Sequence, residues 1–167
     1  MFSGDLGNAC SPLMRDPSIL TEADLVLMES TYGDRDHRND EETLEELAAI
    51  LQAAHRDGGN VLIPSFAVGR TQDLIYYLGR FYQEGRLPQQ AVFLDSPMAV
   101  STTGLYQHHL GEHRLSAAQC HAMALVAKMT RSADESKAIA RQHGAIVSVD
   151  AYQSAGSMQI DVQRDGI

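Results

Sequence analysis

The chain has 167 residues, of which 44% are hydrophobic and 21% are charged. This composition excludes a disordered chain, because enough apolar side chains are present to form a core. At about 150 residues per domain, the length predicts roughly one domain. Thirteen basic residues against 22 acidic ones leave a net charge of -9. That charge argues against binding of a polyanion over the whole surface, although a local basic groove stays compatible with it.

The cysteines and the absence of targeting signals predict the compartment. Cys10 and Cys120 stand in no CxxC pair, which favours a reducing cytoplasm over a disulfide-bonded scaffold. No apolar run approaches the roughly 18 residues of a membrane span, and the first residues lack the basic and apolar stretches of a signal peptide. We therefore expect a cytoplasmic protein without membrane association.

The first elements in chain order are an apolar run and a helical pattern. Residues 23–29 (ADLVLME) predict a buried strand. Asn39 is the expected N-cap of a helix with an acidic first turn, and Gly58 is its expected stop. The apolar residues of this helix recur at helical spacing: Leu44, Leu47, Ala48, Leu51 and Ala54.

The same alternation continues downstream. Residues 61–63 predict a second strand, after which Ser65 is the expected N-cap of a helix that closes at Gly85. The inner face of that helix is expected to carry Leu74, Leu78 and Phe81. Residues 91–94 predict a third strand, and residues 102–129 a helical region broken near Gly111.

The last part of the chain completes the predicted fold. Ser132 and Glu135 have the spacing of a capping box, opening a helix that ends at Gly144, and residues 145–149 predict a fourth strand. Apolar strands joined by helices predict an α/β fold, with a mostly parallel sheet covered by helices on both faces. Functional residues are expected at the carboxyl ends of its strands, which are residues 29–32, 64–66 and 95–97.

Motifs for phosphate binding and nucleophilic catalysis are largely missing. The chain has no GxGxxG, no GxxxxGK[ST] and no GxSxG. Asp95 and Ser96 would fit a nucleophilic set, but a serine after a strand more often caps a helix, and we favour the cap. Arg70, in the first turn of a helix, fits either phosphate binding or a salt bridge to a nearby acid, and its spacing leaves both open.

Metal-binding patterns are sparse as well. No HxH and no HExxH occurs. Asp34, Asp36 and His37 form a cluster that fits metal ligands, but a solvated turn before a helix is the favoured interpretation. His109 and His113 have the spacing of two ligands on one helix, and no third ligand stands near them.

Five segments in order resemble one known family. They are residues 2–7 (FSGDLG), 29–35 (ESTYGDR), 63–72 (IPSFAVGRTQ), 94–99 (LDSPMA) and 130–137 (TRSADESK). Together they resemble metallo-β-lactamase-fold nucleases that carry a β-CASP domain. The ESTYG and LDSPMA forms are similar to the RNA-processing branch, which includes RNase J and the pre-mRNA 3′-end endonuclease. The resemblance implies an incomplete strip of a metallo-β-lactamase domain at 1–22 and an incomplete β-CASP domain at 23–167.

The resemblance also implies a chemistry. In this family a water held by two zinc ions attacks an RNA phosphodiester, and the RNA lies between the two domains. The metal-bridging aspartate corresponds to Asp5. The acid of ESTYG corresponds to Glu29, which is expected to orient the histidine that protonates the leaving oxygen. The residues expected to contact RNA are Arg35, His37, Ser65, Phe66, Arg70 and Ser96.

Departures from the family pattern shape the functional prediction. The HxHxDH zinc motif and the later SAH segment are absent, and residues 151–158 match the family's SGM region only loosely. We therefore expect a fragment of a zinc-dependent ribonuclease that is inactive by itself, with a homodimer as an open assembly state. A non-catalytic α/β module that binds RNA or a protein partner is the alternative. A nucleotide- or small-molecule-binding protein is weaker, because the glycine-rich loops are missing.

Overall fold

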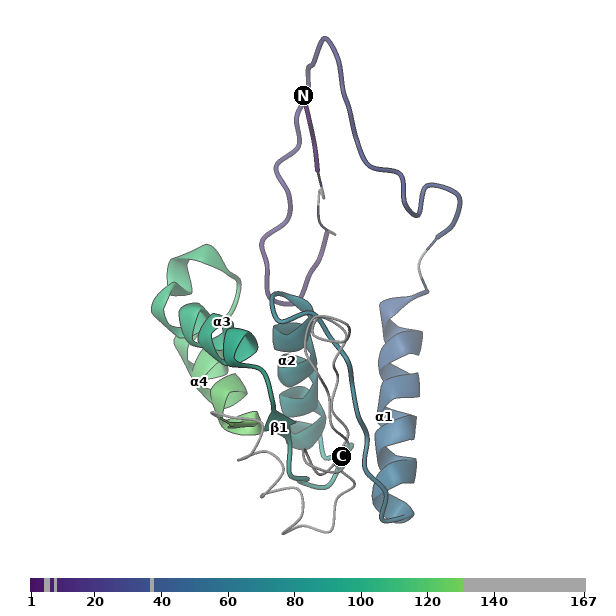
Figure 1. The fold of residues 1–167 in the computed structure, drawn as a ribbon, viewed down its shortest axis with the longest axis vertical. Helices are drawn as coiled ribbons and strands as arrows, with labels where there is room; N and C mark the ends of the chain where they lie inside the picture. The colour runs from purple at the N-terminus through teal and green to yellow at the C-terminus, as the bar shows by residue number, and fades with distance from the viewer. Residues whose placement is uncertain (5–6, 8, 37, 131–167) are drawn as a thin grey trace, which may run out of the picture.

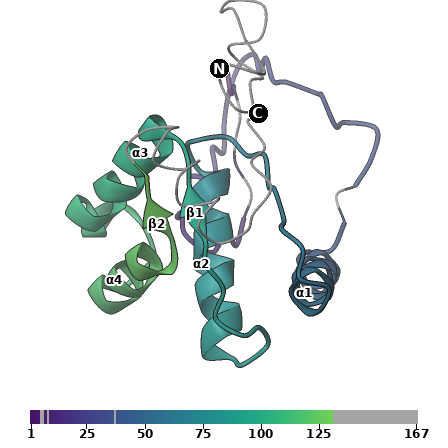
Figure 2. The same cartoon turned by 60° about the horizontal axis from the view of Figure 1, so that its bottom comes forward.

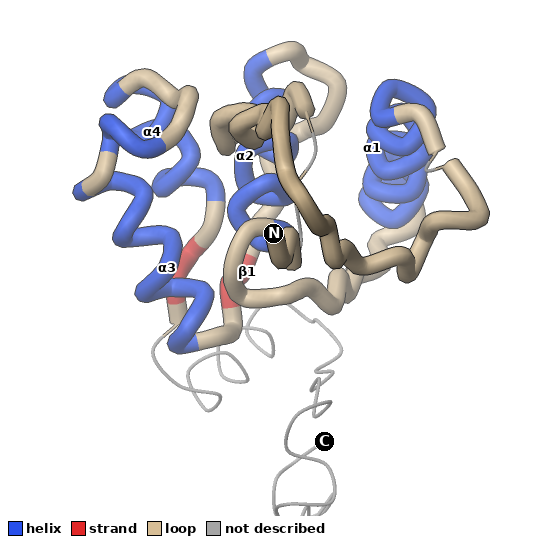
Figure 3. The backbone as a smooth tube through the Cα atoms, turned by 90° about the horizontal axis from the view of Figure 1, so that it is seen from above, coloured by secondary structure: helices blue, strands red, loops and turns tan. Residues whose placement is uncertain are grey.

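The computed structural model describes residues 1–4, 7, 9–36 and 38–130 (Figure 1). The helices of this part are α1 (Asp40–Arg56), α2 (Arg70–Gln83), α3 (Pro97–His108) and α4 (Ala117–Val126), with a 3-10 turn, η1 (Leu110–Glu112). The strands are β1 (Phe93–Leu94) and β2 (Lys128–Met129). Figures 1 and 3 show α2 between α1 and the α3–α4 pair. None of the helices among these residues has the length and apolarity needed to cross a membrane.

Helix α1 forms as the sequence predicts. The Asn39 side chain accepts a hydrogen bond from the Glu41 N–H at 2.8 Å, which satisfies one of the free amides of the first turn. The acidic first turn and the basic last turn both complement the helix dipole. After the helix, Gly58 adopts a φ of 68°, a conformation that glycine reaches at little cost.

Helix α2 begins five residues later than the predicted cap. Gly69, with φ at 82°, precedes the first helical residue, Arg70. The expectation that Ser65 caps this helix is wrong, because its hydroxyl lies 2.8 Å from the hydroxyl of Thr71 instead. The intervening residues form a loop that hydrogen-bonds back to the first helical turn.

Helix α2 has a buried cluster on each of two sides. Against α1 lies the first cluster: Ala48, Leu51, Leu78, Phe81 and Leu87. Toward α4 lies the second: Leu13, Ile75, Leu115, Cys120, Met123 and Ala127. Gly79 allows α2 and α4 to approach, since a Cβ there would meet a methyl group of Val126 at 3.0 Å. The central position of α2 explains why its apolar residues occupy more than one narrow stripe.

The strands β1 and β2 pair in parallel, with Phe93 opposite Lys128 and Leu94 opposite Met129. Figure 2 shows them side by side. The connection between them runs through α3 and α4, as a parallel pair requires. The α/β class is therefore confirmed. The helical region expected at 102–129 is present only in part: it begins at Pro97 and ends at Val126, and its expected last residues form strand β2 instead.

Two predicted strands are absent from this sheet. Within residues 23–29, only Leu27 forms a bridge, in parallel with Phe2. Residues 61–63 form no strand. A strand is buried by its neighbours, and neither segment joins β1 and β2: among the described residues, residues 23–29 pair only with residues 1–3, and residues 61–63 have no strand partner. The helix expected at 132–144 and the strand at 145–149 lie outside the described residues.

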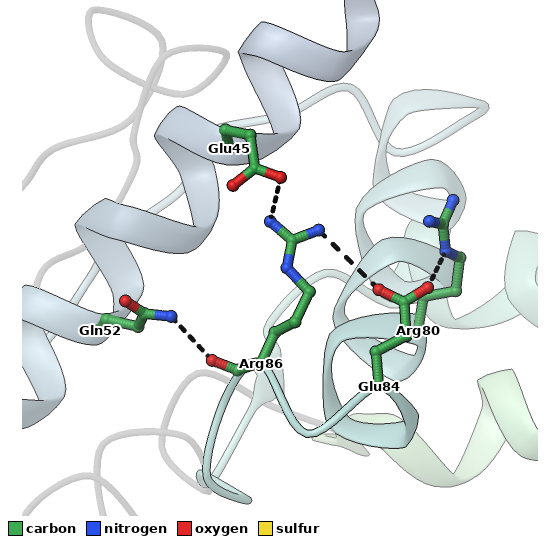
Figure 4. A network of polar contacts seen from close by, with 5 residues as sticks. All are labelled: Glu45, Gln52, Arg80, Glu84 and Arg86. Carbon is green, nitrogen blue, oxygen red and sulfur yellow. Dashed lines mark hydrogen bonds and ion pairs between the residues drawn. The ribbon is translucent and has the colours of Figure 1, made fainter.

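A polar network ties α1 to the turn after α2 (Figure 4). The Arg86 guanidinium lies 2.9 Å from a Glu45 oxygen and 3.8 Å from a Glu84 oxygen, and 4.5 Å from the centre of the Phe81 ring. The Gln52 amide donates to the Arg86 carbonyl at 2.8 Å. Arg86 therefore serves the packing of two helices and is not available to a ligand.

Candidate functional site

The loop of residues 65–69 leads into α2 and presents side chains to solvent. Phe66 is 76% exposed and Val68 is 62% exposed. Arg70, which follows the loop as the first residue of α2, is exposed as well. An exposed aromatic ring on a loop can stack on a base, and an exposed cation at the start of the following helix can bind a phosphate.

Thr71 holds the first half of this loop. Its N–H and its hydroxyl both donate to the Phe66 carbonyl, at 3.3 and 2.7 Å. Because the hydroxyl proton of Thr71 is used in that bond, Ser65 must be the donor in the 2.8 Å contact between the two hydroxyls. The exposed Ser65 thus contacts the loop's anchor, Thr71, through its hydroxyl.

Gln72 holds the second half of the loop. Its side chain is fully buried, accepts from the Gly69 N–H at 2.8 Å and donates to the Ala67 carbonyl at 3.1 Å. It also donates to the hydroxyl of Thr103 on α3 at 3.0 Å. This support of the loop by Gln72 was not predicted from the sequence. The available signal was its spacing of three residues from Ile75, which places the two on one helix face.

Ser96 lies at the carboxyl end of β1 and caps α3. Its hydroxyl accepts a hydrogen bond from the Ala99 N–H at 3.2 Å, so the cap favoured from the sequence is confirmed. The Thr103 hydroxyl donates to the Ala99 carbonyl at 2.8 Å. A continuous polar path therefore runs from the loop of residues 65–69 through Gln72 and Thr103 to the start of α3.

Arg70 and Arg35 differ in their availability to a phosphate. The Arg35 guanidinium contacts both oxygens of Asp34, at 2.8 and 3.0 Å. Arg70 alone, among the arginines of the described ranges, has neither a carboxylate within 4.0 Å nor a side-chain hydrogen bond to protein. Of the two roles that the sequence left open for Arg70, the close salt bridge is therefore not formed within these ranges.

The nearest charge effect on Arg70 comes from Asp73. Burial raises the pKa of Asp73, while the Arg70 charge acts to lower it and the Asp40 charge to raise it. The charges of Arg70 and Asp73 thus attract each other, although the two side chains form no ion pair. A ligand phosphate at Arg70 would therefore not have to displace an ion pair.

Glu29 lies in the exposed N-terminal part of the chain. One of its carboxylate oxygens accepts the Thr31 N–H at 2.8 Å, and this hydrogen bond lowers the pKa of Glu29. No hydrogen bond or ion pair in the described part connects Glu29 or Arg35 to the loop of residues 65–69. The structure therefore brings Ser65, Phe66, Arg70 and Ser96 into one framework, but not these two. Asp5 and His37 lie outside the described residues.

The described residues do not suit a metal site. Nowhere among them do three histidine, cysteine or acidic side chains converge so that they could hold an ion. His109 and His113 do not share a helix, because α3 ends at His108. His113 accepts the Leu115 N–H at Nδ1, so its ring proton is on Nε2, which lies 2.8 Å from the Tyr106 carbonyl. The ring is thus a packing element.

Comparisons with known proteins agree with this arrangement. The Beta-Casp domain family matches residues 71–158, which is more than half of the chain. The chain belongs to the β-CASP family. The matched region contains α3, α4, both strands and nearly all of α2, and the loop of residues 65–69 directly precedes it. The family expectation from the sequence segments is thereby confirmed.

Of three similar proteins, two are named as ribonucleases and one is named as a cleavage and polyadenylation specificity factor. Ribonuclease TTHA0252 of Thermus thermophilus is 50% identical over 107 residues, covering 64% of this chain and 24% of that protein. An RNase J-like protein of Methanocaldococcus jannaschii is 27% identical over 113 residues, covering 66% and 27%. Cleavage and polyadenylation specificity factor 73 of Drosophila melanogaster is 32% identical over 88 residues, covering 52% and 13%. The chain spans about a quarter of the length of the first two.

Proposed function

We propose that this chain is part of a zinc-dependent ribonuclease that hydrolyses RNA phosphodiester bonds, and that its loop of residues 65–69 with Arg70 contacts the RNA. The observation that carries this proposal is Arg70, which is exposed, pairs with no carboxylate of the described residues and follows the exposed Phe66 by four residues in the sequence. A guanidinium binds phosphate oxygens, and an aromatic ring stacks on an unpaired base. The names of the similar proteins support RNA as the substrate class.

The catalytic assignments rest on the resemblance to the family. Nucleases of this family depend on metal ions, and we propose zinc, with Asp5 as a ligand and Glu29 as the residue that orients the proton-donating histidine. The described residues do not themselves form a metal site. The metals would therefore be held mainly by residues outside them, and the chain by itself is expected to be inactive. His37 and the paired Arg35 are proposed as further RNA contacts.

A non-catalytic RNA-binding module is the second candidate, and the same loop supports it. Zinc content and hydrolysis distinguish the two. We expect the purified chain to bind RNA, hold less than two zinc ions and hydrolyse nothing. Stoichiometric binding of two zinc ions would contradict the fragment proposal. We also propose a cytoplasmic location, supported by the free thiols of Cys10 and Cys120.

Salt-dependent RNA binding tests the proposed contact. We expect Arg70→Ala to weaken binding of a short single-stranded RNA by roughly tenfold and to reduce the slope of log affinity against log salt by about 1. Arg38→Ala is the matched control. It should change the affinity less than about threefold, because Arg38 is already paired with Glu46 and is not one of the proposed RNA contacts. Fluorescence anisotropy at several salt concentrations measures both.

Equal effects of the two substitutions would contradict the assignment of Arg70 as the phosphate contact. No binding by the unaltered chain at low salt would overturn RNA binding by this loop altogether.

A further inference from the structure

The fully buried side chain of Gln72 has no explanation in the core around it. Burying an amide is costly unless each of its polar atoms is hydrogen-bonded, and a leucine would fill the same place without that demand. Gln72 meets the demand completely: one bond is accepted from Gly69, and two are donated, to Ala67 and to Thr103. Two of these three partners are backbone atoms of the exposed loop of residues 65–69.

Thr103 on α3, the third partner of Gln72, is buried and hydrogen-bonded as well. Thr103 is fully buried, and its hydroxyl accepts from Gln72 while donating to the Ala99 carbonyl at 2.8 Å. The single proton of the hydroxyl is therefore committed to Ala99, and the direction of the Gln72 amide is fixed. A flipped amide would set an oxygen against the Ala67 carbonyl.

The loop depends on this anchor because its own residues cannot supply one. Phe66 and Val68 point to solvent, and Gly69 adopts a φ of 82°. Thr71 fixes the Phe66 carbonyl, while Gln72 fixes the next carbonyl and the Gly69 amide. Removing the Gln72 amide would leave Ala67 and Gly69 without these partners and release the half of the loop that leads into Arg70.

We propose that Gln72 and Thr103 are positioning residues, which hold the loop of residues 65–69 so that Phe66 and Arg70 face an RNA strand together. This inference rests on the proposed function. It adds that two buried side chains, which no RNA can touch, set the affinity of the exposed ones. It also couples the loop to α3, whose cap, Ser96, follows β1.

The test uses Gln72→Leu and Thr103→Val in the 167-residue chain, with Thr103→Ser as the conservative variant that keeps the hydroxyl. Gln52→Leu is the matched control, because Gln52 also donates to a backbone carbonyl, that of Arg86, far from the loop. Two quantities are measured by NMR and fluorescence anisotropy: hydrogen exchange of the Gly69 amide relative to amides within α1, and affinity for a short single-stranded RNA.

We expect the Gly69 amide to exchange at least about tenfold faster in Gln72→Leu, while amides of α1 keep their protection, since loss of one hydrogen bond is an effect of this order. Thr103→Val should give a smaller effect of the same kind, and Thr103→Ser should restore the original rate. RNA affinity should fall with the exchange rate, by about five- to tenfold in Gln72→Leu. Gln52→Leu should change neither quantity.

Unchanged Gly69 exchange in both Gln72→Leu and Thr103→Val would overturn the positioning role. Faster exchange with unchanged RNA affinity would also overturn it, because the loop geometry would then not matter for binding. If the unaltered chain binds no RNA, the proposed function fails instead, and the exchange measurement still decides whether Gln72 holds the loop. If Gln72→Leu does not fold, the valine and serine variants of Thr103 decide.

Discussion

The described residues of 1–36 leave most of their large apolar side chains exposed, whereas residues 40–130 bury many of theirs between helices. In the first region Ile19 is 90% exposed and Leu25 is 64% exposed, and the ribbon runs away from the helices (Figure 1). In the second region Phe81 and Ile75 are buried between helices. An apolar run is therefore buried only where a second helix or strand packs against it. Hydrophobic surface is removed from water by neighbours and not by sequence.

One apolar residue of the N-terminal region is buried like those between the helices. Leu13 is fully buried in the cluster that includes Ile75 and Met123. Its carbonyl accepts the Arg114 N–H at 2.8 Å, and the adjacent Met14 pairs with His113 in an antiparallel bridge. Residues 10–16 are therefore an attachment segment, which fixes the N-terminal region to the loop between α3 and α4.

The largest expected effect is a loss of stability in the helical region. Phe81→Ala should destabilise the chain by about 3–5 kcal/mol, because it leaves a cavity between α1 and α2. Phe66→Ala is the matched control and should change stability by less than about 0.5 kcal/mol, since its ring already lies in water. Urea unfolding followed by circular dichroism measures both. Similar losses for the two would mean that the phenylalanine environments differ less than the structure shows.

A smaller effect tests the attachment segment. Leu13→Ala should cost about 2–4 kcal/mol, whereas Leu25→Ala should be nearly neutral, because Leu25 contacts water. The Leu13 variant should also be cut faster by protease within residues 17–36, while α1 and α2 stay intact. Equal stability of the two variants would contradict the attachment of the N-terminal region through Leu13.

The smallest effect is a pH dependence of the same segment. The Cys10 N–H donates to Asp16 at 2.7 Å, and Arg114 lies 2.5 Å from its other oxygen. These contacts, the Cys10 hydrogen bond first, lower the pKa of Asp16. A carboxylate with a lowered folded pKa stabilises fully above its unfolded pKa of about 3.9, and this contribution is lost as the pH falls through the lower folded value.

The chemical shift of the Cys10 amide between about pH 2 and pH 6 reports this titration. Its midpoint should lie below the ordinary pKa of an aspartate, about 3.9. Asp16→Asn should remove the transition and leave the shifts of α1 unchanged. A midpoint at or above the ordinary value would show that the contact with Cys10 and Arg114 does not favour the ionised carboxylate.

Local sequence signals predicted the helices well and the strands poorly. The Asn39 cap, the acidic first turn and the spacing of Ala48 and Leu51 are properties of one segment, and the structure reproduces them in α1. The strands expected at 23–29 and 61–63 needed partners from elsewhere in the chain. Ser65 was misassigned for a related reason: a serine near a helix start has a cap and a loop contact open to it, and the tertiary neighbour Thr71 decided between them.

The sequence by itself determined the family, through five ordered segments, and the residue types available at the candidate site, including Phe66 and Arg70. The sequence could not decide whether Arg35 or Arg70 is open to a phosphate. That depends on which guanidinium lies close enough to a carboxylate to pair with it, as Arg35 does with Asp34. Nor could it show that Gln72 turns inward to hold the loop, since an amide in a first helical turn fits the surface equally well. Only the packing of α2 between α1 and the α3–α4 pair decided that, because it closes Gln72 off from water and leaves Gly69, Ala67 and Thr103 as its partners.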